Sequence, residues 1–187
     1  MITKPQGYEE AQAFTGEYES LPAGGYVCRI VSAKENKSST GKPMLKLALD
    51  ISEGAYKDFF KKKFDKDTRD EKKWGCTYYQ MLTNESAGFL KGLVEDIEKS
   101  NGFKWDWDEN KLKGKLVGML FQREEYEKSS GDIGLFAKPI SPRSIQTIRE
   151  GDFKVPEDKP LFTKESTSTY TPPEGFVPAP DDDDLPF

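Results

Sequence analysis

Apolar and polar residues alternate with a period of two over much of the first half of the chain, which predicts β-strands. Residues 24–37 open with a glycine pair and are rich in β-branched side chains, and "SSTGKP" at 38–43 supplies the residues of a hairpin turn. Residues 44–51 are the predicted second strand of this hairpin, and apolar and polar residues alternate along them. Its core-facing positions are expected to be Leu45, Leu47, Leu49 and Ile51.

The next apolar stretch, "YKDFFKKKF" at 56–64, fits two periods. With a period of two it is a third strand that has Tyr56, Phe60 and Phe64 on one side and a basic face with one aromatic on the other. The same three aromatics also fit helical i, i+4, i+8 spacing. We take the strand as the prediction and keep the helix as the alternative.

Residues 84–99 form the clearest predicted helix. Leu90, Val94 and Ile97 recur at helical spacing together with Ala87, and Asn101 followed by glycine ends the pattern. Two further predicted strands follow at 113–128 and 132–141. Five strands with one helix between the third and fourth is the chain order of an OB-fold, so we predict a mainly β, five-stranded OB-fold barrel with one inserted helix.

The composition excludes several classes of function. The chain has no histidine, which removes histidine triads and histidine-based acid–base catalysis, and it has neither a phosphate-binding loop nor a dinucleotide fingerprint. Cys28 and Cys76 lie far apart, so a disulfide framework is not expected. We therefore predict no enzymatic activity, no cofactor and a cytoplasmic location. No apolar run is long enough for a membrane span.

One carboxylate cluster raises the question of a metal. Asp106, Asp108 and Glu109 have the oxygen ligands that a divalent cation accepts. Their place in a polar stretch favours a solvated loop, so we predict no metal site. A nuclease that uses this cluster stays as a remote alternative.

Charge is divided unevenly along the chain. Residues 151–187 hold nine acidic and three basic residues, a net charge of −6, which leaves about +1 for residues 1–150. The acidic pI of the whole chain therefore does not exclude a polyanionic partner. We predict an N-terminal extension at 1–20, the barrel at 21–150, a disordered proline-rich linker at 151–180 and an acidic tip at 181–187.

Basic and aromatic residues are interleaved through the predicted barrel. A protein that binds single strands needs cations for the phosphates and exposed rings on which bases stack. Any small barrel also buries several aromatics, so each ring is open to a core role, and acidic neighbours can neutralise the lysines. Trp105 and Trp107 are expected to be the best stacking platforms, because they alternate with charges in a polar loop after the helix. The candidate contacts are Tyr26, Arg29, Lys42, Lys46, Lys57, Phe59, Lys61, Lys62, Lys63, Trp74, Tyr78, Tyr79, Trp105, Trp107, Arg123, Tyr126 and Lys138.

The chain ends in "DDDDLPF", an acidic block followed by an apolar, proline-stiffened plug. This segment resembles the acidic C-terminal tip of bacterial single-stranded-DNA-binding proteins. The resemblance implies that Phe187 enters an apolar pocket on a partner and that the aspartates meet a basic rim around it. The predicted partner-binding residues are Asp181, Asp182, Asp183, Asp184, Leu185, Pro186 and Phe187.

The body is similar to single-stranded-DNA-binding proteins of phages and mobile elements of Gram-positive bacteria. The similarity rests on residues 21–64, with "PAGGY" before the first strand and "GKPML" leading into the second. It implies an OB-fold and binding of single-stranded DNA without sequence preference during replication, recombination or repair, with partner proteins recruited by the tip. The alternative is an adaptor or inhibitor that mimics the host protein's tail and does not bind DNA. The oligomeric state stays open, a homodimer included.

Overall fold

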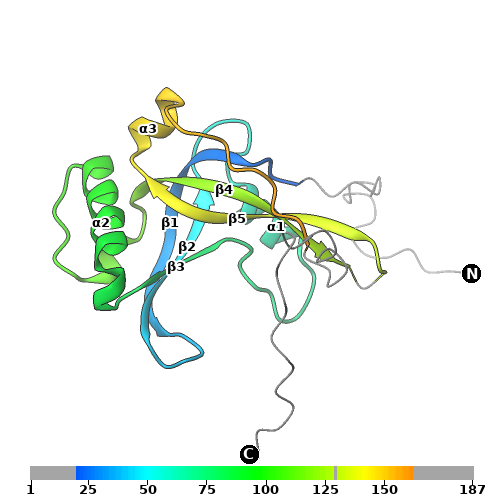
Figure 1. Ribbon diagram of the computed structural model, residues 1–187, viewed down its shortest axis with the longest axis horizontal. Helices are drawn as coiled ribbons and strands as arrows, with labels where there is room; N and C mark the ends of the chain where they lie inside the picture. The colour runs from blue at the N-terminus through cyan, green and yellow to red at the C-terminus, as the bar shows by residue number, and fades with distance from the viewer. Residues whose placement is uncertain (1–19, 129, 162–187) are drawn as a thin grey trace, which may run out of the picture.

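The computed structural model describes residues 20–128 and 130–161 (Figure 1). The order of the elements follows the prediction except at residues 56–64. The elements are β1 (Gly24–Lys37), β2 (Pro43–Ile51), α1 (Phe59–Lys66), β3 (Thr77–Met81), the 3-10 turn η1 (Asn84–Ser86), α2 (Ala87–Asn101), the 3-10 turn η2 (Glu109–Leu112), β4 (Leu116–Glu127), β5 (Ile133–Arg143) and α3 (Ile145–Glu150).

The five strands described here form one antiparallel sheet in the order β3-β2-β1-β4-β5. The central strand, β1, pairs with β2 on one side and with β4 on the other. The end strands β3 and β5 contact each other and nearly close the sheet into a barrel. The predicted fold, a mainly β, five-stranded OB-type barrel with a helix between the third and fourth strands, is confirmed.

The third strand was placed wrongly by the sequence pattern. Residues 56–64 belong largely to α1, and the third strand is the short β3 at Thr77–Met81. The helical spacing of the aromatics decides the outcome, because Phe60 packs into the core and Phe64 contacts Trp74 with ring centroids 5.5 Å apart. Buried Asp50 also favours the helix, since its Oδ1 accepts the N–H of Phe60 at 3.0 Å.

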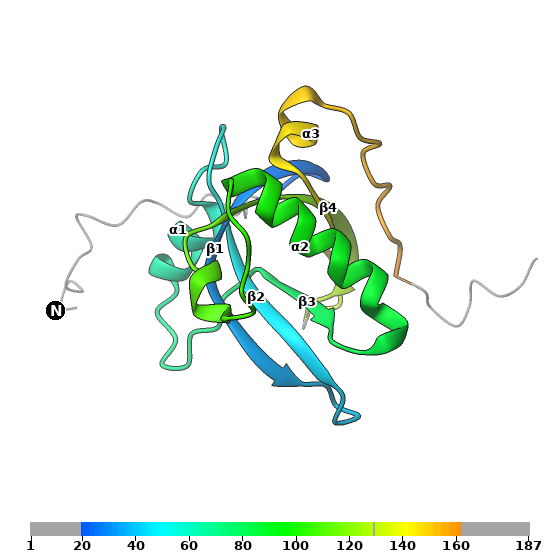
Figure 2. The ribbon, with the colours of Figure 1, turned by 90° about the vertical axis from the view of Figure 1, so that its left-hand side faces the viewer.

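The core follows the predicted alternation of β2. Leu45, Leu47, Leu49 and Ile51 are all buried against the inward faces of β1 and β4. The helix α2 covers one end of the barrel, where Leu93 and Ile97 are buried (Figure 2). Burying one such side chain contributes roughly 1.5–3 kcal/mol, so α2 is held mainly by its inward stripe.

Two glycines make room for the chain that follows α3. A Cβ on Gly25 would lie 2.5 Å from Cζ of Phe153 and 2.9 Å from Cδ1 of Ile148, and a Cβ on Gly118 would lie 2.6 Å from Cγ1 of Ile148. Because neither glycine has a side chain, Ile148 and Phe153 pack directly on the β1–β4 pair. This explains the second glycine of "PAGGY".

Residues 151–161 belong to the predicted disordered linker, yet Phe153 packs over Gly25 of β1 and residues 157–161 lie along β4. Beyond the end of β1, the N–H of Lys159 donates to the carbonyl of Arg123 at 2.8 Å, and the N–H of Glu125 donates to the carbonyl of Lys159 at 3.0 Å. Composition did not reveal this, because the contact depends on a free edge of β4 and on Phe153. The rest of the predicted linker, the tip and residues 1–19 lie outside the described residues.

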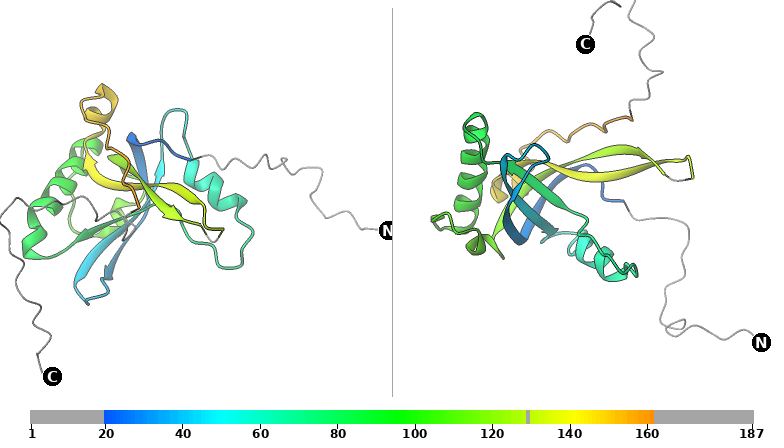
Figure 3. Two further views of the ribbon diagram at one scale, coloured as in Figure 1. Left: turned by 45° about the vertical axis from the view of Figure 1, so that its right-hand side comes forward. Right: turned by 90° about the horizontal axis from the view of Figure 1, so that it is seen from below.

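The β4–β5 hairpin projects beyond the barrel, which is clearest in Figure 3. Tyr126 packs over Gly134, where a Cβ would lie 2.6 Å from the tyrosine ring.

Among the residues described, no helix is long and apolar enough to cross a membrane.

Candidate nucleic-acid interface

A surface groove of about 280 Å³ lies where β3 and β5 approach each other. Trp74, Thr77 and Tyr79 line one side, and Phe136 and Lys138 of β5 line the other. The sheet does not pair β3 with β5. Side chains therefore line the space between these strands, and this space is open to solvent. We call it the aromatic groove.

Tyr79 is the most exposed ring of the aromatic groove, with 51% of its surface accessible. It faces outward because β3 alternates, and the neighbouring Gln80 points into the barrel and is buried. Lys46 lies directly opposite Tyr79 on β2, with its Nζ 5.9 Å from the ring centre. This arrangement places a cation beside an aromatic face that the core does not use.

Trp74 and Phe136 complete the set of rings. The indole N–H of Trp74 donates to the carbonyl of Leu49 at 2.8 Å, and its ring packs on Phe64, so the orientation of the half-buried indole is fixed. Phe136 is 42% exposed and meets Tyr126 edge to face with centroids 5.7 Å apart. Tyr79 and Phe136 are therefore held by the strands β3 and β5, and Trp74 is held by its hydrogen bond to β2.

Two lysines lie at the groove. Lys138 of β5 is part of its far wall, and Lys46 of β2 lies beside Tyr79. The Nζ of Lys138 is 3.5 Å from Glu124, which also lies 3.3 Å from the Nζ of Lys159. One carboxylate therefore faces two lysines.

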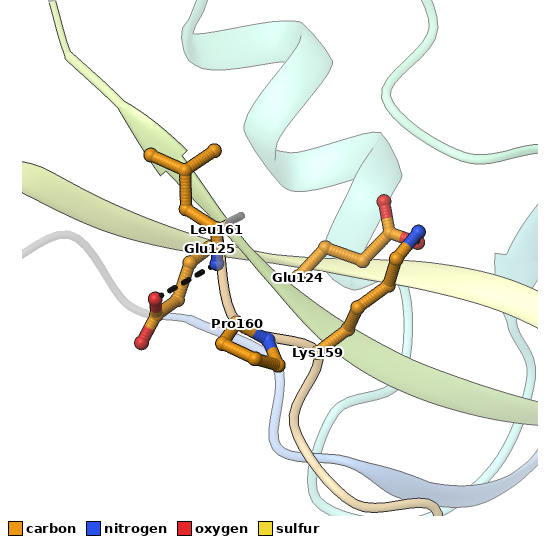
Figure 4. Close-up of a pocket in the computed structure, with 5 residues that line it drawn as sticks. All are labelled: Glu124, Glu125, Lys159, Pro160 and Leu161. Carbon is orange, nitrogen blue, oxygen red and sulfur yellow. Dashed lines mark hydrogen bonds and ion pairs between the residues drawn. The ribbon is translucent and has the colours of Figure 1, made fainter. Parts of the chain in front are cut away.

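The chain that follows α3 reaches this same region. Figure 4 shows Lys159, Pro160 and Leu161 against Glu124 and Glu125 of β4, where the N–H of Leu161 donates to the Glu125 carboxylate at 3.1 Å. Glu124 thus joins the end of the described chain to Lys138, which lines the aromatic groove.

The geometry suits a flexible polyanion that carries flat rings. Exposed aromatic faces accept bases by stacking, and lysines at the margin replace the counterions of the phosphates. The outward side of the second and third strands is also the part of an OB barrel with which oligonucleotides and oligosaccharides are bound. Of the predicted contacts, the structure brings together Lys46, Trp74, Tyr79 and Lys138, with Tyr126 beside them.

The tryptophans expected to be the best stacking platforms do not line the groove. Trp105 and Trp107 lie between α2 and β4 and pack on each other with centroids 4.9 Å apart. Trp105 is half-buried and its indole N–H donates to the carbonyl of Asp108 at 2.8 Å, whereas Trp107 is 65% exposed. The polar sequence around these two tryptophans predicted that both are exposed. The prediction holds for Trp107 and not for Trp105.

Three other predicted rings belong to the fold. Phe59 is buried, which follows from its place on α1 instead of on a strand, and it cannot serve as a stacking platform. Tyr78 points inward, and burial raises its pKa. Tyr26 packs edge-on against Tyr56 and Phe121, and burial raises its pKa to about 12, with Tyr56 adding to the shift.

The remaining predicted cations lie outside the groove lining. Arg29 pairs with Asp58 at 3.1 Å, and Arg123 forms an ion pair with Asp158. Lys61 pairs with Asp65 at 2.6 Å on α1. The predicted cations that lie exposed on α1, beside it or in the β1–β2 turn are Lys42, Lys57, Lys61, Lys62 and Lys63.

Phe136 was missed by the sequence reasoning. The pattern that would have found it is the alternation of β5, because Phe136 and the predicted Lys138 are two residues apart and share a face.

The carboxylates of the loop that follows α2 are used locally. Asp106 forms an ion pair with Lys111, which holds the pKa of Asp106 below its usual range. Asp108 accepts the N–H of Asn110 at 3.0 Å and so caps η2. In the part of the chain that the structure describes, no group of three or more cysteines and carboxylates is placed to hold a metal ion.

Comparisons with known proteins add no family to this picture. No protein-family model matches the chain, and no curated protein matches it at a significant level. A barrel of this type supports many functions, so function has to be argued from the groove itself.

Proposed function

We propose that this protein binds single-stranded DNA without sequence preference and recruits partner proteins of replication, recombination or repair through its acidic tip. The observation that carries the proposal is the aromatic groove, in which Trp74, Tyr79 and Phe136 lie beside Lys46 and Lys138. The proposed role is non-enzymatic and belongs in the cytoplasm of a bacterium or an infected cell.

Stacking and charge both supply affinity in this proposal. Base stacking on an aromatic side chain contributes roughly 1–3 kcal/mol per base and is tolerant of sequence, because every base has a π face. The lysines add a term that depends on salt and does not read the base. Within the groove lining, the polar side chains are those of Thr77, Tyr79 and Lys138, too few to read base edges. The groove therefore favours binding without sequence preference.

The tip is proposed to act on proteins and not on DNA. Residues 181–187 lie outside the described part of the chain, so this half of the proposal rests on the sequence. A proline before the final aromatic lowers the ordering cost of docking, and terminal carboxylates are captured by dedicated sites. Binding to a partner should therefore require Phe187 and the preceding aspartates together.

Binding of a labelled single-stranded oligonucleotide at two salt concentrations tests the proposal. We expect tight binding that weakens steeply with salt, and much weaker binding to a duplex of the same sequence. Absence of binding at low salt would overturn it and favour the adaptor that mimics a host tail. Loss of the labelled strand in the presence of magnesium would instead indicate the nuclease alternative.

Tryptophan fluorescence locates the site in the same titration. DNA should quench the emission of Trp74, so the Trp74→Phe variant should lose most of the quenching. The matched control is Trp107→Phe, which removes a more exposed indole that does not line the groove and should leave the quenching in place. The reverse result would move the DNA site to the loop that follows α2.

A further inference from the structure

The positive charge of the body is concentrated in residues 57–73, which contain α1 and most of the loop that leads from it into β3. These residues include eight basic and five acidic side chains, a net charge of +3. Because residues 1–150 together carry about +1, the rest of that part of the chain carries about −2. We call residues 57–73 the basic extension.

Several cations of the basic extension have no carboxylate partner. Asp65 pairs with Lys61 at 2.6 Å, and Asp67 pairs with Arg69 at 2.5 Å. Within the described part of the chain, no carboxylate lies at ion-pair distance from the other exposed lysines, which are Lys57, Lys62, Lys63, Lys66, Lys72 and Lys73. Their charges are therefore available to a polyanion.

The basic extension meets the aromatic groove at Trp74. This residue lines the groove and packs on Phe64 of α1 with ring centroids 5.5 Å apart. The Nζ of Lys72 lies 5.7 Å from the centre of the Phe64 ring, and Lys73 is the residue before Trp74. Figure 3 shows α1 and the loop after it beside the start of β3. A strand that leaves the groove past Trp74 therefore meets lysines at once.

The two ends of β3, which lines the groove, differ in charge. β3 begins at Thr77, next to the basic extension, and ends at Met81, which leads into η1 and α2. Residues 84–101, which form η1 and α2, hold four acidic and two basic residues, a net charge of −2. A polyanion is therefore attracted at the start of β3 and repelled at its end.

We propose that single-stranded DNA held in the aromatic groove leaves it past Trp74 and continues over the basic extension. This inference rests on the proposed function and adds the direction of the DNA path. Within the basic extension, Phe59 and Phe60 are buried and Phe64 packs on Trp74 beside Lys72, so no ring is free to stack on a base. The contacts are with phosphates, so they depend on salt and on the length of the DNA but not on its sequence.

Oligothymidylates of increasing length, from about 4 to about 16 nucleotides, test the path with the full chain. The double variant Lys63→Gln with Lys66→Gln neutralises two exposed cations in the last turn of α1. For the shortest oligonucleotide that the native protein binds, the variant should have native affinity. For the longest one, the slope of log K against log salt should be smaller by about 1.4, because each phosphate contact contributes about 0.7.

The matched control is Lys91→Gln with Lys99→Gln, which removes the same charge from two exposed lysines of α2. Both lie beside Glu95, at 3.9 and 3.7 Å, in the segment whose net charge is negative. The affinity and the salt slope of this control should stay native at every length, because the proposed path does not pass α2.

The outcomes separate this inference from the proposed function. If the native protein bound no length of DNA, both would be overturned. If native affinity did not increase with length, or if the Lys63 and Lys66 variant matched the control throughout, the path alone would be overturned and the basic extension would suit an acidic protein segment instead. Equal weakening at every length would place these lysines at the groove itself and would also overturn the path.

Discussion

Lys46 and Tyr79 face each other across the β2–β3 pair, with the lysine Nζ 5.9 Å from the centre of the ring. Neither side chain is needed by the core, since both lie on the outward face of their strands. A cation and an exposed ring held at fixed positions on a sheet are the two elements that binding of a single strand requires. The first predictions follow from this pair.

Replacing the Tyr79 ring should weaken binding of single-stranded DNA. Tyr79→Ala removes one stacking face worth roughly 1–3 kcal/mol, which corresponds to about 5- to 150-fold in the dissociation constant. Tyr79→Phe keeps the face and should bind nearly as the native protein does. Fluorescence anisotropy with a labelled oligonucleotide measures both.

Phe89→Ala is the matched control for Tyr79→Ala. Phe89 is a highly exposed ring on α2 that does not line the aromatic groove. Its removal should leave the affinity unchanged, because an exposed ring contributes only where the strand passes. An equal loss in both variants would show that stacking is not confined to the groove.

The lysines beside the groove should set the salt dependence. Each phosphate contact contributes about 0.7 to the slope of log K against log salt for single strands, so Lys46→Gln and Lys138→Gln should each lower the slope by about that amount. Lys104→Gln on the α2 side is the control, since Lys104 pairs with Glu98 at 2.6 Å and does not line the groove. If none of the three substitutions changed the slope, DNA would not pass Lys46 and Lys138 as proposed.

The alternation of apolar and polar side chains was enough to predict most strands of the barrel from the sequence. The large apolar residues of β2 follow a period of two and the stripe of α2 follows the helical period, so local pattern found both. It did not find the burial of Ala48 and Asp50 between those residues of β2. The stretch at 56–64 satisfied both periods, and what decided it was tertiary, the burial of Phe60 and its hydrogen bond to Asp50. β3 is five residues long, too short to give a periodic signal of its own.

The candidate site was less readable because it depends on which strands meet. Lys46, Tyr79 and Lys138 were all identified by residue type, but their grouping depends on the approach of β3 to β5. Residue type also selected Phe59 and Trp105, although the core uses Phe59 and the loop that follows α2 uses Trp105. The edge of β4 that receives Lys159 likewise exists only because β1 ends first.

A side chain at Gly25 should loosen the segment that follows α3. Gly25→Ala places a Cβ against Phe153 and Ile148, and overpacking of this kind costs about 1–3 kcal/mol in the free energy of unfolding. Denaturant unfolding should show that the penalty shrinks when Phe153→Ala is added, because the clash is with that ring. Gly88→Ala is the opposite control, since its Cβ meets open space on α2 and should stabilise the helix. A neutral Gly25→Ala would show that Phe153 does not pack there in solution.

Buried Asp50 should make stability fall as pH rises. Burial raises the pKa of this carboxyl, although the N–H groups of Phe60 and Ile51 oppose the shift. The folded state therefore holds its proton to higher pH than the unfolded state, and the protonated form's contribution is lost upward from about pH 4, the ordinary range of an aspartate.

Asp50→Asn isolates this effect from the other carboxylates. The amide oxygen can accept the same two N–H groups but carries no charge, so the stability of the variant relative to the native protein should increase with pH across that range. Urea unfolding at several pH values measures the difference. A difference that moves the other way would mean that the start of α1 stabilises the ionised carboxylate more than burial disfavours it.

Deletion of residues 181–187 should strengthen DNA binding or leave it unchanged, and it should abolish capture of partner proteins. The tail carries −6 and the body about +1, and the described chain ends at Leu161 beside Glu125, next to the two lysines that share Glu124. The 26 residues that follow Leu161 include six acidic residues and one lysine, so we predict that they compete with phosphates for the lysines of the aromatic groove. Changing Asp181 to Asp184 into asparagines, with the last three residues kept, separates charge from the apolar plug. That variant should bind DNA as the deletion does, and weaker DNA binding in either variant would contradict the competition.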